Sequence, residues 1–162
     1  MMRRAILLAA LGLAVAACRT PVPTEEVEVS GLETYWAIDP AVGQTQYLAP
    51  CARFLVRNKK DAEQHSVQAT ATFRRKGEEN LTWGADWRQV ATTAKPLGPQ
   101  QQSVVVLKSD ARYYSTGTPA SMFEHKLFRD ASVEVFVKVG SSGWVKMGEA
   151  PIERRIGSKS VE

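Results

Sequence analysis

The chain has 162 residues, of which 44% are hydrophobic and 23% are charged. This composition suits one globular domain and is too rich in apolar residues for a disordered tail. Two cysteines are too few for a disulfide framework, so the fold must depend on its hydrophobic core. The formal net charge of +4 raises the question of a polyanionic partner.

The first 17 residues have the layout of a secretory signal peptide. Residues 1–4 form a short basic segment, and residues 5–17 form an unbroken apolar run. As a helix, this run would span about 20 Å, which is less than the roughly 30 Å hydrocarbon core of a bilayer. Removal of the signal takes Arg3 and Arg4 with it and leaves 19 basic against 17 acidic residues, so the net charge falls to +2.

The apolar run ends in Val15-Ala16-Ala17-Cys18, and polar residues follow. This segment resembles the lipobox of bacterial lipoproteins, in which the cysteine is lipidated and becomes the mature N-terminus. The thiolate is required there because it is the nucleophile that takes the diacylglycerol group. The resemblance implies lipid attachment at Cys18 and a location in the cell envelope. Arg19, in place of Asp, favours the outer membrane, facing the periplasm, over the inner membrane. The alternative is an ordinary signal peptide beside an unrelated cysteine.

The remaining chain divides into a tether, one domain and a short tail. Residues 18–26 contain two prolines and no apolar periodicity, which predicts a flexible tether after the lipidated N-terminus. Residues 27–157 are expected to fold, and residues 158–162 are expected to be a disordered tail.

Apolar residues in the domain recur at every second position, which is the period of half-buried strands. The two clearest strands contain Val67, Ala69, Ala71 and Phe73 and, later, Val133, Val135, Val137 and Val139. Further strands are expected at 32–38, 47–57, 81–90, 103–108, 144–147 and 152–156. Turns are expected between them, including one at Asp39-Pro40.

One segment departs from the strand period. In residues 119–129, Met122, Phe123 and Leu127 recur at helical spacing, and Ser121 with Glu124 has the form of a capping box. We predict one short crossover helix near residues 119–129. Seven or more short strands with one small helix predict an all-β fold, an antiparallel β-sandwich.

Three passages of the domain resemble the immunoglobulin-like modules of bacterial envelope proteins. They are the strand that ends in Asn58, the strand that ends in Phe73, and the Pro-Leu-Gly-Pro turn at residues 96–99. The resemblance implies an immunoglobulin-like sandwich that serves as an accessory domain of uncharacterised type. A shared fold does not identify an activity.

The sequence contains no motif of a known catalytic centre. His65 and His125 are 60 residues apart, and the sequence has no cluster of metal-ligand residues. We therefore predict a non-enzymatic protein with no catalytic residues, metal or cofactor. The basic runs at 74–76 and 154–155 adjoin glutamates, and export removes the partner, so nucleic acid is not expected to bind.

Two local features offer candidate sites. On a strand, Cys51 shares a face with Arg53 and Arg57, which would lower the pKa of its thiol and favour a redox role. The alternative is a small buried hydrophobic residue. Trp83 and Trp87 are four residues apart, so a strand through both would form an apolar strip that binds a sugar ring or peptide. The alternative is that both indoles pack in the core.

These observations favour a lipid-anchored cell-envelope protein that acts as a non-enzymatic interaction module. Its partners would be the membrane, through the lipid, and another envelope protein, bound at a sheet edge or through an exposed aromatic patch. The second hypothesis is an envelope lipoprotein that binds a glycan or small ligand with Trp83 and Trp87.

The lipid anchor can be tested by replacing Cys18 with Ser. Serine lacks the thiolate that accepts the lipid, so the variant should lose labelling by a fatty-acid probe and leave the membrane fraction. Labelling and fractionation of cells that express each form measure this. Membrane association equal to that of the parent chain would contradict the prediction.

Overall fold

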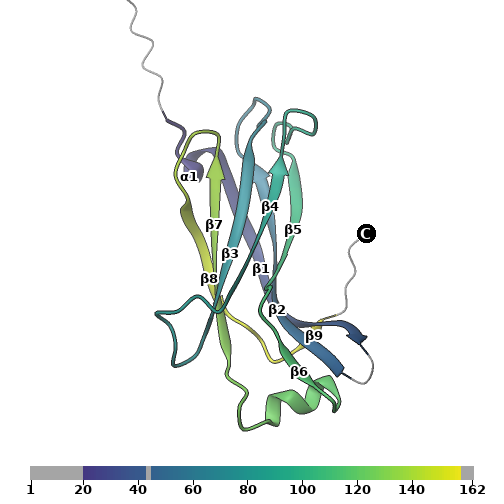
Figure 1. Ribbon diagram of the computed structural model, residues 1–162. Helices are drawn as coiled ribbons and strands as arrows, with labels where there is room; N and C mark the ends of the chain where they lie inside the picture. The colour runs from purple at the N-terminus through teal and green to yellow at the C-terminus, as the bar shows by residue number, and fades with distance from the viewer. Residues whose placement is uncertain (1–19, 43–44, 158–162) are drawn as a thin grey trace, which may run out of the picture.

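The computed structural model describes residues 20–42 and 45–157. The predicted signal peptide, Cys18 and the predicted tail lie outside these residues. Two sheets pack face to face and form an elongated sandwich (Figure 1). No helix in the described part of the chain is long and apolar enough to cross a membrane.

The first sheet has the strand order β5-β2-β1-β9, and β6 also pairs with β2. Its strands are β1 Val27–Val42, β2 Thr45–Asn58, β5 Gln102–Lys108, β6 Tyr113–Ser115 and β9 Ile156–Gly157. The second sheet has the order β4-β3-β7-β8. Its strands are β3 Val67–Arg75, β4 Gly84–Ala91, β7 Ala131–Val139 and β8 Val145–Pro151. Neighbouring strands are antiparallel except for the short β1–β9 pair, so the predicted all-β antiparallel sandwich is confirmed.

The alternation of apolar and polar residues in β3 and β7 places the apolar side chains in the core, as predicted. Every second residue of both strands is buried, beginning with Val67 in β3 and Ala131 in β7. These side chains pack in one core with the inward residues of the first sheet, including Phe54, Val56 and Leu107. Burial of each large apolar side chain stabilises the fold by roughly 1.5–3 kcal/mol, so the facing rows hold the sheets together.

An aromatic cluster fills one end of the core. Trp36 is fully buried and lies with its ring centroid 5.2 Å from that of Phe128 and 5.9 Å from that of Tyr113. Trp83 and Phe123 complete the cluster at centroid distances of 6.3 and 6.2 Å from Trp36. Tilted and edge-on rings at these separations attract each other beyond the effect of area burial.

The predicted crossover helix exists but is shorter and of another type. Residues Pro119–Glu124 form a 3-10 helix, η1, which connects β6 of the first sheet to β7 of the second. The amide of Ser121 donates to the Thr118 carbonyl and that of His125 to the Met122 carbonyl, so the turns close over three residues. The predicted capping box is absent from η1, and Phe128 is buried in place of Leu127, which is exposed.

The strand layout differs from the prediction in three places. The turn expected at Asp39-Pro40 lies inside β1, where the β1–β2 register shifts between Asp39 and Val42, and a proline is tolerated at such an irregularity. Of the strand expected at 152–156, only Ile156 belongs to β9. The three-residue strand β6 was not predicted because it is too short to display a period.

The predicted tether is shorter than expected. Residues Pro23–Glu26 form one helical turn, α1, and Pro23 is buried. Lys59 holds this turn with two bonds: its Nζ donates to the Thr24 carbonyl at 2.9 Å, and its amide donates to the Glu26 carbonyl at 2.9 Å. The packed chain therefore begins at Pro23 and not at Val27. The turn and η1 lie at opposite ends of the sandwich (Figure 1).

Asn58 connects two loops at the end of the sandwich that carries α1. It is fully buried, and its Nδ2 donates to the carbonyls of Ala62, Leu97 and Gly98 at 2.8, 3.0 and 3.0 Å. Its Oδ1 accepts a bond from the Lys60 amide at 2.9 Å. A buried amide that satisfies four backbone groups fixes both loops in place.

Replacement of Asn58 by Ala should therefore destabilise the protein. The four backbone groups lose their partner in a site from which water is excluded, so the free energy of unfolding should fall by about 3 kcal/mol. Urea denaturation measures the change. Asn80, an exposed loop residue, is the matched control, since its replacement by Ala should change stability by less than about 0.5 kcal/mol. Equal effects of the two substitutions would contradict the role of Asn58.

Candidate functional site

The strongest candidate for a functional site lies where the edges of the two sheets meet. Strand β4 ends one sheet and β5 ends the other, and the two edges lie side by side without forming a ladder (Figure 1). An edge strand presents unpaired N–H and C=O groups, which can pair with another chain. What closes each edge therefore decides where another chain can bind.

Two aspartates join the edges at one point. Asp86 of β4 accepts a bond from the Lys108 amide of β5 at Oδ2, at 3.0 Å. Asp110, just beyond β5, accepts a bond from the Ala85 amide at 2.9 Å, and its own amide approaches the Ala85 carbonyl at 3.4 Å. Side-chain carboxylates therefore take the place of a backbone ladder here. Gly84 is required beside them, because an added Cβ would lie 1.9 Å from the Ser109 hydroxyl.

Side chains of β4 also close the next part of its own edge. The Trp87 amide donates to Oδ1 of Asp86 at 2.8 Å, and the Trp87 carbonyl accepts a bond from the Arg88 guanidinium at 3.1 Å. Arg88 in turn pairs with Asp86 at 3.1 Å. The outward backbone groups at Ala85 and Trp87 are thus already satisfied within the chain.

The edge of β5 is open at Val104 and Val106. The amide of Ser109 donates inward to the Pro50 carbonyl of β2, whereas the amide of Lys108, one residue earlier, donates outward to Asp86. Backbone groups of successive residues point to opposite sides of a strand. The N–H and C=O groups of Val104 and Val106 therefore also point outward, away from β2. In the described part of the chain, no side chain caps the backbone groups of these two residues. Val104 is 53% exposed.

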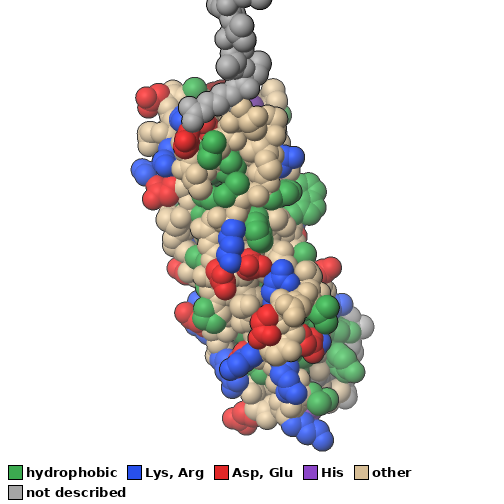
Figure 2. Space-filling view, turned by 90° about the vertical axis from the view of Figure 1, so that its left-hand side faces the viewer, with side chains coloured by type: hydrophobic (Ala, Val, Ile, Leu, Met, Phe, Trp, Pro, Cys, Tyr) green, Lys and Arg blue, Asp and Glu red, His purple; other side chains and the backbone are tan. Residues whose placement is uncertain are grey.

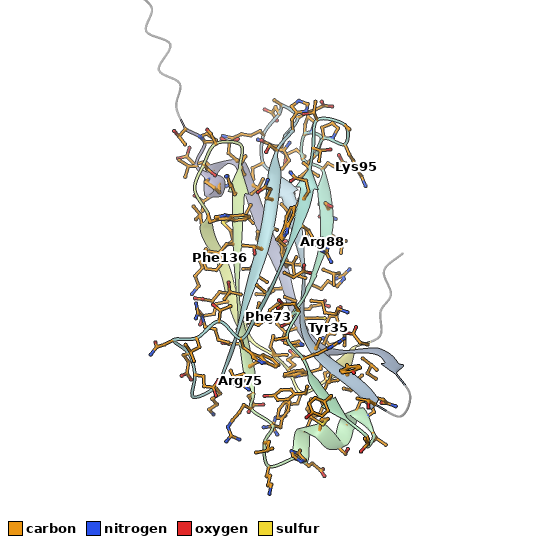
Figure 3. The ribbon with its side chains drawn as sticks, in the orientation of Figure 1. Tyr35, Phe73, Arg75, Arg88, Lys95 and Phe136 are labelled. Atoms are coloured by element: carbon orange, nitrogen blue, oxygen red, sulfur yellow. The ribbon has the colours of Figure 1, made fainter. Side chains whose placement is uncertain are left out.

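Beyond the aspartates, a groove of about 730 Å³ runs between the two edges. The cations that line it come from both sheets and from the loop after β4: Arg53, Arg88, Lys95 and Lys108. None of its described lining residues is acidic. In Figure 3, the labelled Lys95, Arg88 and Tyr35 are spread along the β4 and β5 side of the sandwich, away from Phe136. By contrast, charges of both signs mix on the β8 side (Figure 2).

An ion network adjoins the groove at Lys108. Lys108 Nζ donates to Asp39, which is nearly buried, and the Arg112 guanidinium donates to the same carboxylate at 3.2 Å. Burial alone would raise the pKa of Asp39, but the hydrogen bonds and charges of Lys108 and Arg112 outweigh it and hold this pKa below its ordinary value. Lys108 is therefore committed to the fold, and the other three groove cations are more exposed.

Cys51 lies beneath this network and is not activated. It is 1% exposed and clusters with Tyr35 and Ala37 on the outer side of the first sheet. Burial raises the pKa of its thiol to about 12, and the charge of Lys108 opposes this only in part. The expectation that neighbouring arginines lower this pKa was wrong, because the thiol is desolvated. Its environment favours the alternative, a small buried hydrophobic residue.

Trp83 and Trp87 do not form the predicted strip. Strand β4 begins at Gly84, so Trp83 leaves the strand alternation and packs against the aromatic cluster, while Trp87 is 58% exposed. Trp83 lines a second hollow of about 620 Å³ near η1, with Tyr113, Tyr114 and Phe128 among its neighbours. Arg75 lies over the Trp83 ring at 5.5 Å from its centroid. Trp87 is not part of this hollow.

The two histidines contact near neighbours in the sequence: His65 Nε2 lies 3.8 Å from a carboxylate oxygen of Glu63, and His125 Nδ1 accepts a bond from the Leu127 amide. His65 and His125 are both exposed, and the described residues contain no cluster of three or more His, Cys, Asp or Glu that could hold a metal ion. The groove itself was missed in the sequence. The one signal in the sequence was the run Val104-Val105-Val106, because strand alternation exposes at least one valine of such a run. The sequence does not show that this strand lies at the edge of its sheet, since that depends on the order of the strands.

Comparisons with known proteins do not identify a family. No family model matches the sequence, and the curated proteins contain no significant match. Among solved structures, an alkylpurine DNA glycosylase AlkC from Pseudomonas fluorescens, bound to DNA with an abasic site analog, is 15% identical with a TM-score of 0.40. A protein from Archaeoglobus fulgidus is 9% identical with a TM-score of 0.38. An exo beta-N-acetylglucosaminidase from Vibrio harveyi, in complex with N-acetylglucosamine, is 10% identical with a TM-score of 0.24.

These matches differ in how much of each protein they cover. The three matches cover 82%, 77% and 79% of this chain, in the same order. This chain spans 30% of the glycosylase, 96% of the Archaeoglobus protein and 18% of the glucosaminidase. At these TM-scores, no activity of the three proteins transfers to this chain.

Proposed function

We propose that this chain is a lipid-anchored protein of the cell envelope, on the periplasmic face of the outer membrane. Its sandwich, of the immunoglobulin-like kind that the sequence resembles, would act as a non-enzymatic interaction module. The partner is another envelope protein, which binds in the groove between β4 and β5. The observation that carries this proposal is the asymmetry of the two edges: side chains close β4 at Ala85 and Trp87, whereas β5 is open at Val104 and Val106.

The position of the groove supports a role for the anchored domain. The described chain begins beside α1, at one end of the sandwich (Figure 1). The groove lies on the side of the sandwich where β4 and β5 meet. A lipid on Cys18 would hold the α1 end near the membrane. The side of the sandwich would then stay accessible to a partner in the same compartment.

A second candidate function is the binding of a small ligand in the hollow near η1. Its volume of about 620 Å³ lies in the range of small-molecule sites, and Trp83, Tyr113, Tyr114 and Phe128 line part of its wall. Trp83 offers part of its indole there, with Arg75 above the ring. This observation favours Trp83 alone as a ligand contact, without Trp87.

The groove can be tested by photo-crosslinking in cells. A photoreactive amino acid at Val104 should yield a discrete adduct with one protein in the membrane fraction, because the side chain lies in the groove and is exposed. Ser141, an exposed residue of the β7–β8 loop, is the matched control position and should yield none. Adducts of equal yield at both positions, or at neither, would contradict the groove as the interaction site.

A further inference from the structure

The groove supports a more specific inference, which rests on the proposed function. We infer that β5 binds an extended, acidic peptide segment of the partner, which adds to the first sheet as a new edge strand. Three features of the groove carry this: the open backbone of β5, the cations along both sides, and the closure of β4 at Ala85 and Trp87.

The backbone of β5 sets the geometry of binding. Val104 and Val106 each direct an N–H and a C=O outward, two residues apart, which matches the repeat of a strand that pairs antiparallel or parallel. Lys108, the next outward residue, is already occupied by Asp86. The added strand would therefore pair along residues 102–106 and end where the two aspartates join the sheets. Addition at a sheet edge takes its affinity from main-chain bonds and its specificity from side chains.

The charges of the groove select an acidic segment. In the described part of the chain, Lys95 Nζ has no carboxylate partner. Arg53 lies 3.9 Å from Glu33, and Arg88 lies 3.1 Å from Asp86, with both arginine side chains at least 40% exposed. The Arg53–Glu33 pair is exposed on both sides and contributes at most about 1 kcal/mol, so a carboxylate of a bound peptide can compete for Arg53.

The same charges disfavour a second copy of this chain as the occupant. A second copy of this chain would bring its own set of groove cations, Arg53, Arg88 and Lys95, close to those of the first, and like charges repel each other. Cations on an edge strand also protect proteins from aggregation. If the groove cations serve only that purpose, neither test peptide will bind.

The test uses the full chain in detergent and two fluorescent ten-residue peptides, acetylated and amidated, measured by fluorescence anisotropy. One peptide alternates valine with glutamate, and the other alternates valine with lysine. In either register, such a strand places its charged residues on one face and its valines on the other. We expect the glutamate peptide to bind, with an affinity that falls as salt rises, and the lysine peptide to bind at least about tenfold more weakly.

Two variants of Val104 separate strand addition from simple adhesion. Val104→Pro removes the outward N–H, whereas Val104→Ala removes the same side chain and keeps the N–H; proline at an outward edge position leaves the β2–β5 ladder intact. We expect Val104→Pro to weaken binding of the glutamate peptide by at least about tenfold and Val104→Ala by less than about threefold. Equal losses in the two variants would overturn strand addition.

A charge-reversed variant keeps the test decisive if Val104→Pro fails to fold. Arg53→Glu combined with Lys95→Glu changes only side chains at the surface, and it should reverse the preference, so that the lysine peptide binds more tightly than the glutamate peptide. An unchanged preference, or no binding of either peptide to the parent chain, would overturn the inference. A discrete cross-link at Val104 without peptide binding would overturn this inference alone and leave the groove as the interaction site.

Discussion

The open side of the sandwich depends on the hydrogen bonds that the Asp86 carboxylate accepts. This carboxylate accepts bonds from the amides of Trp87 in its own strand and Lys108 in the other sheet, and it pairs with Arg88. Backbone donors at a sheet edge need partners, and one side chain supplies two of them here. The sheets are joined at this point without a ladder, so their edges separate beyond it and leave a groove.

The rest of the fold keeps that geometry fixed. The aromatic cluster around Trp36 fills the η1 end of the core, and Asn58 ties two loops at the α1 end. Pro50 lies in β2 between the stretch that pairs with β5 and the stretch that pairs with β6, where its missing N–H leaves no ladder bond unmade. The short strand β6 thus continues the sheet past the end of β5.

Much of the architecture was predictable because strand alternation is a local signal. The valines of β7 and the Val67 to Phe73 row of β3 pointed inward as their period required. The helix was misjudged because three apolar residues over six positions fit a 3-10 turn as well as an α-helix, and burial chose Phe128 over Leu127. Cys51 is buried among Tyr35 and Ala37 of the neighbouring strand, a contact between strands that no local pattern encodes.

The candidate site was less predictable than the fold for a related reason. Whether a strand lies at an edge depends on sheet order, and whether an edge is open depends on which side chains cap it. The neighbouring residues Asp86, Trp87 and Arg88 close their own edge through contacts that only the folded chain brings about. Trp83 and Trp87 have the spacing of a shared strand face, but β4 begins between them.

Residue-resolved amide hydrogen exchange of the full chain, measured by NMR, tests the asymmetry of the two edges most directly. The account predicts rapid exchange at Val104 and Val106, which point outward and uncapped. It predicts slow exchange at Val105 and Leu107, which face β2, and slowed exchange at Ala85 and Trp87, which donate to carboxylates. Protection of Val104 and Val106 equal to that of Leu107, or exchange at Trp87 as fast as at Val104, would contradict it.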